Sequence, residues 1–415
     1  MPTSCNPNVI AANPLKINET SCLENVLHVN RGIRVANRPK AAIMPKRILI
    51  TGGAGFIGSH LADELLTRGY NVRVFDNLCS QVHGNESKWP TYLHRDVERV
   101  AGDVQNADAI ARAVKGVDAV FHFAAMVGVG QSMYEIRKYT AANNLGTATL
   151  METLVEHPVE RLVIASSMSI YGEGAYRRRS GEMAVAFERN LDQLRRAQWE
   201  LCGPDGQELV PIPTPENKPP SLASVYALSK YDQETMCLML GAAYDIPTVA
   251  LRFFNVYGPR QALSNPYTGV LAIFASRLLN GKPPLIFEDG RQRRDFVSVY
   301  DVVQACRLAL EKREAVGQVF NVGSGAHYTI SEIAERIGRV LGKESIRPEI
   351  TNRYRRGDIR HCFADIRKAR QSLGYAPRVS LEEGLIEIAA WVEGQVAYDR
   401  VEQAAAELSA RGLTV

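Results

Sequence analysis

The residues best suited to chemistry in this 415-residue chain are Tyr226 and Lys230, in the sequence Tyr226-Ala-Leu-Ser-Lys230. A spacing of four residues places both side chains on one face of a helix. A phenol has an ordinary pKa of about 10 and is a poor base at neutral pH. A neighbouring positive charge stabilises the phenolate and lowers that pKa. The pair alone is a common coincidence, so its meaning depends on what else lies nearby.

A candidate hydroxyl partner follows a predicted strand at 161–165. That strand ends in the sequence Ser166-Ser167-Met168-Ser169. Open α/β sheets bind their ligands at the carboxyl ends of the strands, which favours a functional hydroxyl there. The alternative is a serine-rich turn that satisfies its own backbone groups.

An electron acceptor is indicated by a glycine-rich turn near residue 52. The continuous apolar run 48–50 is typical of a parallel strand that is covered on both faces. Gly52 permits a tight turn, Gly55 lets the backbone approach a pyrophosphate, and Gly58 lets the helix 56–68 pack closely on the strand. The helix begins at Phe56 and Ile57, and its free N–H groups favour phosphate. The pattern therefore predicts a dinucleotide site.

The next predicted strand, 71–75, ends in Asp76. An acidic residue in this position grips the ribose hydroxyls of a dinucleotide. Its carboxylate would repel a 2′-phosphate, so we expect NAD rather than NADP. With NAD present, Ser167, Tyr226 and Lys230 form a set suited to oxidising an alcohol by hydride transfer.

The order of predicted elements indicates an α/β fold, a Rossmann-type doubly wound parallel sheet with a smaller α+β lobe. We expect a disordered N-terminal tail at 1–43 and an NAD-binding domain at 44–252 with an insertion at 173–221. We expect a substrate lobe at 253–397 and a helical tail at 398–415. Within these, 131–157 is predicted as one long helix and 319–322 as a strand of the lobe. His122 is expected to be a packing residue.

Composition narrows the classes of function. A net charge of +4 is too small to indicate nucleic acid or a membrane surface as partner. No apolar run approaches the roughly 20 residues of a membrane-spanning helix. The seven scattered cysteines favour a reducing, cytoplasmic setting. The insertion contains a single cysteine, Cys202, so we expect no metal site there.

From Arg47 to about Val392, outside the insertion, the chain resembles the extended short-chain dehydrogenase/reductases of the nucleotide-sugar epimerase and dehydratase family. The matching segments are Thr51-Gly-Gly-Ala-Gly-Phe-Ile-Gly58, Asp76-Asn-Leu78, Gly102-Asp-Val104, His122-Phe-Ala-Ala125, Asn143-Asn-Leu-Gly-Thr147, Ser166-Ser-Met-Ser-Ile-Tyr-Gly172, Tyr226-Ala-Leu-Ser-Lys230, Leu251-Arg-Phe-Phe-Asn-Val-Tyr-Gly-Pro-Arg260 and Arg293-Arg-Asp-Phe-Val297.

The resemblance implies roles for residues at matching positions. Ser167 is the hydroxyl partner, Tyr226 is the base and Lys230 holds the nicotinamide ribose. For the substrate, it implies that Asn255 binds the phosphates of a nucleotide-diphosphate sugar and that Arg294 and Arg355 clamp its pyrophosphate. Arginine suits that task because its planar donors pair with phosphate oxygens. Further expected cofactor contacts come from Asn77, Asp103, Val104, Ala124, Ala125 and Asn143. For Asp103, capping of the next helix is an equal alternative.

The branch of the family is indicated by two positions. Family 4,6-dehydratases carry Asp-Glu after the strand-five hydroxyl, where this chain has Met168 and Ser169. A 4-epimerase needs no such acid–base pair, so the resemblance favours that branch. The insertion resembles a subgroup that includes dTDP-L-rhamnose 4-epimerases, while UDP-hexoses and UDP-hexuronates stay open.

Two other hypotheses remain at this point. One is an NAD-dependent nucleotide-sugar oxidoreductase that releases a keto sugar, and the other is a redox-sensing NAD-binding module. The family also forms homodimers through paired helices, here 131–157 and 226–244.

Overall fold

The computed structural model describes residues 47–84, 88–184, 189–263, 265, 267, 269–355, 357–393, 399 and 401–414. The N-terminal tail expected at 1–43 lies outside these residues. Within them, no helix combines the length and apolar character that crossing a membrane requires.

A parallel sheet forms the centre of the structure. Its order is β14-β9-β5-β4-β1-β2-β3, and every pairing in it is parallel. The strands are β1 (Arg47–Thr51), β2 (Asn71–Asp76), β3 (Glu98–Ala101), β4 (Ala119–His122), β5 (Arg161–Ser167), β9 (Thr248–Phe253) and β14 (Val319–Val322). The strand order reverses between β1 and β4, which confirms the predicted doubly wound fold.

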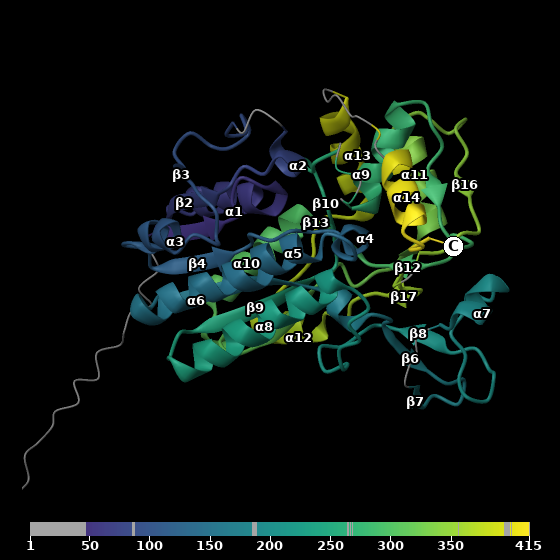
Figure 1. Ribbon diagram of the computed structural model, residues 1–415, viewed down its shortest axis with the longest axis horizontal. Coiled ribbons are helices and arrows are strands. Elements are labelled where there is room, and N and C mark those ends of the chain that lie inside the picture. The colour runs from purple at the N-terminus through teal and green to yellow at the C-terminus, as the bar shows by residue number, and fades with distance from the viewer. Residues whose placement is uncertain are drawn as a thin grey trace, which may run out of the picture. The chain divides into compact units, whose positions relative to one another are not determined.

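Helices cover both faces of this sheet (Figure 1). Ile48 and Ile50 of β1 pack in one core with α1 (Phe56–Thr67), α10 (Val299–Glu311) and α12 (Arg367–Leu373). Leu49 points to the other face, into a core with α3 (Ala107–Val114), α6 (Gly146–Glu156) and α8 (Val225–Ala243). The apolar run is continuous because both faces of the strand are buried.

The single helix expected at 131–157 is wrong. The chain instead forms α4 (Val129–Ser132), α5 (Ile136–Tyr139), the π-helical turn η1 (Thr140–Leu145) and α6. The wide turn brings Asn143 inward, where its amide bonds the backbone of Met126 and the hydroxyl of Ser229. Apolar periodicity cannot reveal a turn of this kind, because the turn is stabilised by contacts far away in sequence.

The smaller lobe packs around its own core. Its helices are α9 (Val270–Leu279), α11 (Ile330–Val340), α13 (Leu381–Val392) and α14 (Val401–Ala410), which gather beyond β10 in Figure 1. Its short strands are β10 (Asn255–Tyr257), β11 (Leu285–Ile286), β12 (Arg293–Arg294), β13 (Phe296–Ser298), β15 (Tyr328–Thr329), β16 (Glu349–Ile350) and β17 (His361–Cys362). Further short helices are α2 (Ser80–His83), η2 (Met168–Tyr171) and η3 (Arg313–Ala315).

The assignment of strand 319–322 to this lobe is wrong. β14 pairs with β9 at the edge of the central sheet, with Phe320 opposite Leu251. The chain therefore enters the lobe after β9, returns through α10 and β14, and enters it again. The boundary between the NAD-binding domain and the lobe at residue 252 stays a prediction. Because the chain returns to the central sheet after that residue, the lobe is not one continuous segment.

The insertion forms a small folded unit. Its strands β6 (Ala175–Arg177), β7 (Met183–Ala184) and β8 (Val210–Ile212) pair antiparallel, and α7 (Leu191–Arg195) follows β7. Tyr176, Leu201 and Leu209 fill its core. Trp199 packs against Tyr354 of the lobe, so the insertion is joined to the lobe by an apolar contact.

The close packing of α1 on β1 yields a first prediction. A Cβ at Gly58 would lie 2.6 Å from both the Gly52 oxygen and the Gly53 Cα. Gly58→Ala should therefore lower the free energy of unfolding by about 1–3 kcal/mol, because backbone must move to admit the methyl group.

Thermal or urea unfolding would measure this effect, with Gly338→Ala in α11 as the control. There the nearest atom is 3.8 Å away, so the helix should be unchanged or stabilised. Equal stability of the Gly58 variant and the wild type would contradict the packing role.

Candidate active site

One cavity of about 700 Å³ lies at the carboxyl ends of the central strands and continues under the lobe. It opens where the strand order reverses, the position at which such sheets bind ligands. Most of the predicted site residues meet in its wall. They are Gly52, Gly55, Phe56, Ile57, Asp76, Asn77, Asp103, Val104, Ala124, Ala125, Ser167, Tyr226, Lys230, Asn255, Arg294 and Arg355.

Two predicted residues lie outside this wall. Gly58 packs against the backbone of Gly52 and Gly53, in the turn that follows β1. Asn143 is fully buried and hydrogen-bonded to Met126 and Ser229. It supports the segment that follows β4 rather than facing the cavity.

The glycine turn fits the diphosphate of a dinucleotide. Gly52 has a φ of +68°, which favours glycine, and a Cβ there would lie 2.7 Å from the Ala124 nitrogen. In the described part of the chain no side chain caps the first turn of α1, which Gly55 precedes. The unpaired N–H groups and the helix dipole therefore remain available for an anion.

Asp76 stabilises the glycine turn, which the sequence did not reveal. Its Oδ2 accepts a hydrogen bond from the Ala54 nitrogen at 3.0 Å, and its Oδ1 accepts one from Leu78 at 2.9 Å. The carboxylate thus fixes the glycine turn while it lies in the cavity wall. The neighbouring His83 has its Nε2 3.7 Å from Oδ1, and burial lowers its pKa.

Asp103 does not cap the following helix. Asn106 is the N-cap of α3, where its side chain accepts a hydrogen bond from the Ala109 nitrogen. Asp103 instead accepts from Asn77 Nδ2 at 3.0 Å and from the Gln105 nitrogen at 2.9 Å. Asp103 and Asn77 thereby hold each other at the cavity wall.

The hydroxyl groups of Ser167 and Tyr226 both lie in the cavity wall. The Ser167 Oγ accepts from the Ser169 nitrogen at 3.2 Å and from the Ser169 hydroxyl at 2.9 Å, so Ser169 fixes the position of this hydroxyl. Burial raises the pKa of Tyr226, and the Ser167 hydrogen bond partly offsets this. A lower phenol pKa therefore requires a positive charge beside the ring.

Lys230 is buried, and burial lowers the pKa of its ammonium to about 8. Its Nζ donates to Gln233 Oε1 at 2.8 Å. Gln233 in turn donates to the Thr147 hydroxyl at 2.7 Å. Gln233 lies three residues after Lys230 on the same helix face, and that spacing is the only sequence signal for its role.

His122 extends this hydrogen-bond chain into the sheet. Its Nε2 lies 2.9 Å from the Thr147 hydroxyl and its Nδ1 lies 2.8 Å from the Thr51 hydroxyl. Burial lowers the pKa of His122 to about 3, so the ring is neutral at physiological pH. It lies outside the cavity wall, in agreement with its expected packing role.

The two predicted phosphate-binding arginines are held in different ways. Arg294 Nη1 donates to the carbonyl oxygens of Arg293 at 3.0 Å and Arg360 at 2.9 Å, while its Nη2 donates to that of Ile359. Within the described residues its Nε and the second Nη2 hydrogen have no acceptor, so one edge of the guanidinium is available to a phosphate. Arg355 lies over the Phe287 ring and donates from Nε to Asp358 at 2.9 Å.

Asn255 lies between the sheet and the lobe. Its Nδ2 donates to the Asp295 carbonyl oxygen at 2.8 Å and lies 3.4 Å from Met168 Sδ. The weak sulfur contact is the one that a phosphate oxygen could replace.

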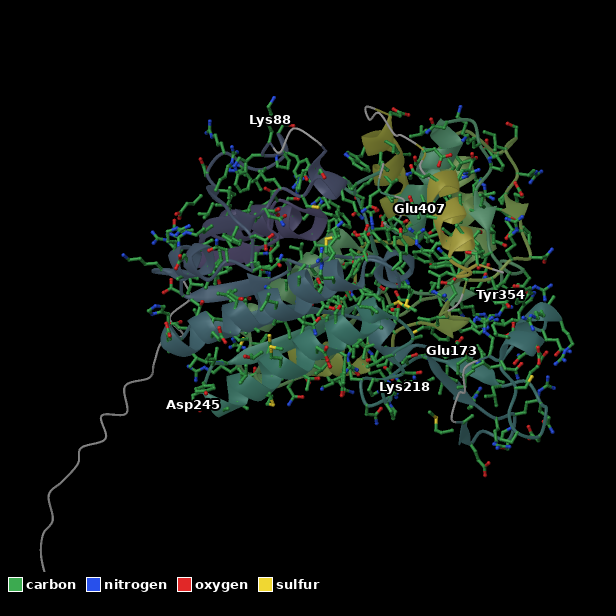
Figure 2. The ribbon with its side chains drawn as sticks, viewed as in Figure 1. Lys88, Glu173, Lys218, Asp245, Tyr354 and Glu407 are labelled. Atoms are coloured by element: carbon green, nitrogen blue, oxygen red, sulfur yellow. The ribbon has the colours of Figure 1, made fainter. Side chains whose placement is uncertain are left out.

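The C-terminal helix α14 contributes to the wall, which the sequence did not indicate. Its apolar residues facing the cavity are Val401, Ala404, Ala405 and Leu408. Glu407, labelled on this helix in Figure 2, accepts a hydrogen bond from the Tyr134 hydroxyl at 2.9 Å. Thr414 bridges to the backbone of Arg355. This segment therefore covers the side of the cavity where Arg355 lies, which is the side expected to bind the nucleotide.

In the described part of the chain, no group of three or more His, Cys, Asp or Glu side chains could hold a metal ion.

Comparison with known proteins places this cavity in context. A profile described as "NAD dependent epimerase/dehydratase family" matches residues 48–189 and 200–323. A dTDP-L-rhamnose 4-epimerase of Burkholderia thailandensis is 36% identical over 352 residues, which are 84% of this chain and 95% of that protein. A UDP-glucose 4-epimerase of Mycolicibacterium smegmatis is 33% identical over 345 residues, 82% of this chain and 96% of that protein.

Solved structures agree with these sequence matches. The UDP-glucose 4-epimerase of Thermotoga maritima, solved with UDP-glucose, superposes with a TM-score of 0.69 at 32% identity and covers 84% of this chain and 98% of that chain. The UDP-glucose 4-epimerase of Thermus thermophilus, solved with NAD, has a TM-score of 0.67 at 31% identity and covers 84% of this chain and 100% of that chain.

The position of Asp76 yields a second prediction. Asp76→Asn keeps an oxygen that can accept from Ala54 but removes the negative charge, so it should reduce the preference for NAD over NADP by about tenfold or more. Asp76→Ala removes both functions and should weaken binding of either dinucleotide.

Fluorescence or calorimetric titration with NAD and NADP would measure both variants. Unchanged selectivity in Asp76→Asn would exclude Asp76 as the residue that reads the ribose.

Proposed function

The chain belongs to the NAD dependent epimerase/dehydratase family, and on that basis we propose that it is an NAD-dependent nucleotide-sugar 4-epimerase. The observation that carries the proposal is the meeting of Ser167, Tyr226 and Lys230 in the wall of the cavity that the glycine turn and Asp76 also line. The matches to two relatives named as 4-epimerases cover 95% and 96% of those proteins. We also propose the catalytic and binding roles below for the individual residues.

The proposed chemistry begins at the C4 hydroxyl of the sugar. The glycine turn, Asp76 and Lys230 would hold NAD, which would supply the hydride acceptor and donor for C4. Tyr226 takes the hydroxyl proton, and Ser167, in the same cavity wall, orients that hydroxyl by a hydrogen bond to it. The buried ammonium of Lys230 lies one helical turn from Tyr226 and holds the nicotinamide ribose.

Inversion follows from turning the 4-keto sugar within the cavity. The diphosphate stays held by Arg294, Arg355 and Asn255 while the opposite face of the ring comes to the cofactor. Tyr226 then gives its proton back to the C4 oxygen. Each turnover leaves NAD in its original state, so a tightly bound cofactor is sufficient.

Two alternative reactions, 4,6-dehydration and oxidation with release of a keto sugar, have different requirements. Elimination of water by a 4,6-dehydratase needs an acid and a base, and the corresponding positions in the cavity wall are Met168 and Ser169. Ser169 donates its hydroxyl to Ser167 at 2.9 Å and so supports the hydroxyl partner. An oxidoreductase that releases a keto sugar would accumulate NADH, whereas an epimerase would not.

The proposed substrate class is nucleotide-diphosphate sugars. The relatives are named for dTDP-L-rhamnose and UDP-glucose, and both sugars carry the diphosphate that the arginines would hold. We keep dTDP-L-rhamnose and UDP-hexose or UDP-hexuronate as candidates, and a reducing cytoplasmic setting as the proposed location, supported by the scattered cysteines.

The proposed homodimer rests on an apolar face of the helices beside the site. Leu228 and Met239 of α8 are 46% and 60% exposed, and Leu145 and Ile136 of the adjoining turns are both 53% exposed. Leu228 and Met239 are eleven residues apart, which is three helical turns, so they share a face. Pairing of this face with a second copy would cover these side chains.

Incubation with dTDP-L-rhamnose, UDP-glucose, UDP-galactose and UDP-glucuronate, followed by NMR at C4, tests the proposed function. We expect a C4-inverted product from one of them without net NADH formation. A keto sugar formed together with stoichiometric NADH would contradict epimerisation and support the oxidoreductase.

The role of Tyr226 yields a third prediction. Tyr226→Phe should lower kcat by about 100-fold or more, because the substitution removes the hydroxyl that takes the proton. NAD should remain bound, since the glycine turn and Asp76 are untouched. Tyr231→Phe, on the same helix but outside the cavity wall, is the matched control. Near-normal turnover of the Tyr226 variant would remove this residue as the base.

The apolar face of α8 yields a fourth prediction. Met239→Glu should convert the dimer to a monomer in analytical ultracentrifugation, because a carboxylate would be buried without a partner. Ile386→Glu in α13 is the control, since Ile386 is also 60% exposed but lies on the other lobe. An unchanged mass for Met239→Glu would place the interface elsewhere.

A further inference from the structure

Charged side chains are buried where the insertion meets the lobe. Arg360 is fully buried, and its Nη1 contacts Glu288 at 2.9 Å and Asp289 at 2.6 Å. Its Nη2 contacts Glu200 of the insertion at 2.5 Å. Arg189 of the insertion contacts the same Glu288 at 2.7 Å. We call these five residues, together with Glu173, the buried ion cluster.

Charge pairing inside the cluster is strong enough to hold its geometry. Burial raises the pKa of Glu200, but hydrogen bonds from His361 and Arg360 lower it to about 2. Glu200 is therefore ionised at neutral pH and holds both partners. Buried ion pairs contribute little net stability compared with apolar packing, so a cluster of this size calls for a role in positioning.

Glu173 connects the insertion to the backbone of the lobe. Its Oε1 accepts from the Arg360 nitrogen at 2.8 Å, and its Oε2 accepts from the His361 nitrogen at 3.2 Å. The Tyr176 hydroxyl of β6 donates to the same Oε2 at 2.9 Å. Both oxygens of one side chain therefore fix the backbone at the start of β17, and Figure 2 labels Glu173 where the inserted sheet meets the lobe.

The backbone that Glu173 fixes is also the backbone that holds Arg294. The carbonyl oxygens of Ile359 and Arg360 accept hydrogen bonds from the end of the Arg294 guanidinium. β12, which carries Arg294, pairs with β17 directly, with Arg294 opposite Cys362. A shift of residues 359–361 would therefore rotate the guanidinium edge that lies in the cavity wall.

We propose that the insertion positions the substrate's diphosphate: Glu173, supported by the buried Arg360, sets the orientation in which Arg294 presents its free edge to the phosphates. The proposal rests on the proposed function, because it takes the ligand to be a nucleoside diphosphate sugar. Glu173 and Arg360 are positioning residues in this account, since neither lines the cavity. The insertion thereby gains a task in substrate binding beyond its own fold.

The first experiment replaces the carboxylate that fixes the backbone. Glu173→Gln leaves one acceptor oxygen and puts an NH2 group against a backbone N–H, so one of the two backbone hydrogen bonds is lost. On the full-length protein loaded with NAD, calorimetry should show about tenfold weaker binding of the nucleoside diphosphate that the wild type binds, UDP or dTDP. NAD affinity should stay within about twofold, because Glu173 does not line the cavity wall that holds the glycine turn.

Turnover provides a readout that a purely structural role would not move. With the substrate that the wild type epimerises, KM should rise by about tenfold while kcat stays within about twofold. Arg178→Ala is the matched control, because it breaks the exposed Arg178–Asp205 ion pair within the same insertion. That variant should leave nucleoside diphosphate affinity unchanged.

A double-mutant cycle with Arg294 decides between positioning and general support of the fold. In an Arg294→Ala background, Glu173→Gln should weaken nucleoside diphosphate binding no further. An equal loss in both backgrounds, or unchanged affinity in Glu173→Gln alone, would overturn the proposal. If Glu173→Gln fails to fold, Glu200→Gln takes its place, because it loosens Arg360 from a partly exposed position.

The calorimetric readout separates this proposal from the proposed function. If the wild type binds UDP or dTDP but inverts no sugar, the proposed 4-epimerase activity is contradicted. The double-mutant cycle would still show whether Glu173 acts on nucleotide binding through Arg294. A wild type that binds neither nucleotide would overturn both.

Discussion

A buried ammonium group has to be hydrogen-bonded, and the way in which Lys230 meets this requirement joins the candidate site to the sheet. Lys230 donates to Gln233, which donates to Thr147, and Thr147 and Thr51 bond the two nitrogens of His122. These contacts connect α8, α6, β4 and β1. The position of the proposed catalytic residues is therefore set by the packing of the central sheet rather than by a loop of its own.

The cavity is assembled from parts with different physical characters. The glycine turn offers backbone N–H groups, the strand ends offer hydroxyls, and the lobe offers guanidinium groups. Burial raises the pKa of Tyr226 in the protein alone, so the phenol becomes a base only beside a positive charge. Lys230 and the oxidised nicotinamide ring are the groups proposed to supply it, which makes base strength depend on a bound, oxidised cofactor.

Local sequence patterns were sufficient to predict the fold class and most of the residues in the cavity wall. The run 48–50 indicated a strand buried on both faces, and the glycines, Asp76 and the strand-end serines lie where their local pattern placed them. Their positions follow from turns and periodicity within a few residues, which a sequence displays directly. The resemblance to a family added Asn255, Arg294 and Arg355, which no local pattern singles out.

Features that depend on contacts far apart in the chain were not predictable. The long helix at 131–157 is broken so that Asn143 can support Met126, and β14 leaves the lobe to pair with β9. The cover formed by α14 depends on Tyr134, which is 273 residues from Glu407. The buried ion cluster likewise joins the insertion to residues beyond position 287, and charged residues in a sequence give no sign of such burial.

The central claim is that one resident NAD removes the C4 hydride and returns the same hydride to the opposite face. It is tested most directly with the accepted nucleotide sugar carrying deuterium at C4, incubated with the enzyme and an excess of unlabelled NAD and NADH. The account predicts that the deuterium is retained at C4 of the inverted product and that none enters the added NADH. Loss of deuterium to the added NADH, or its replacement by hydrogen at C4, would contradict it.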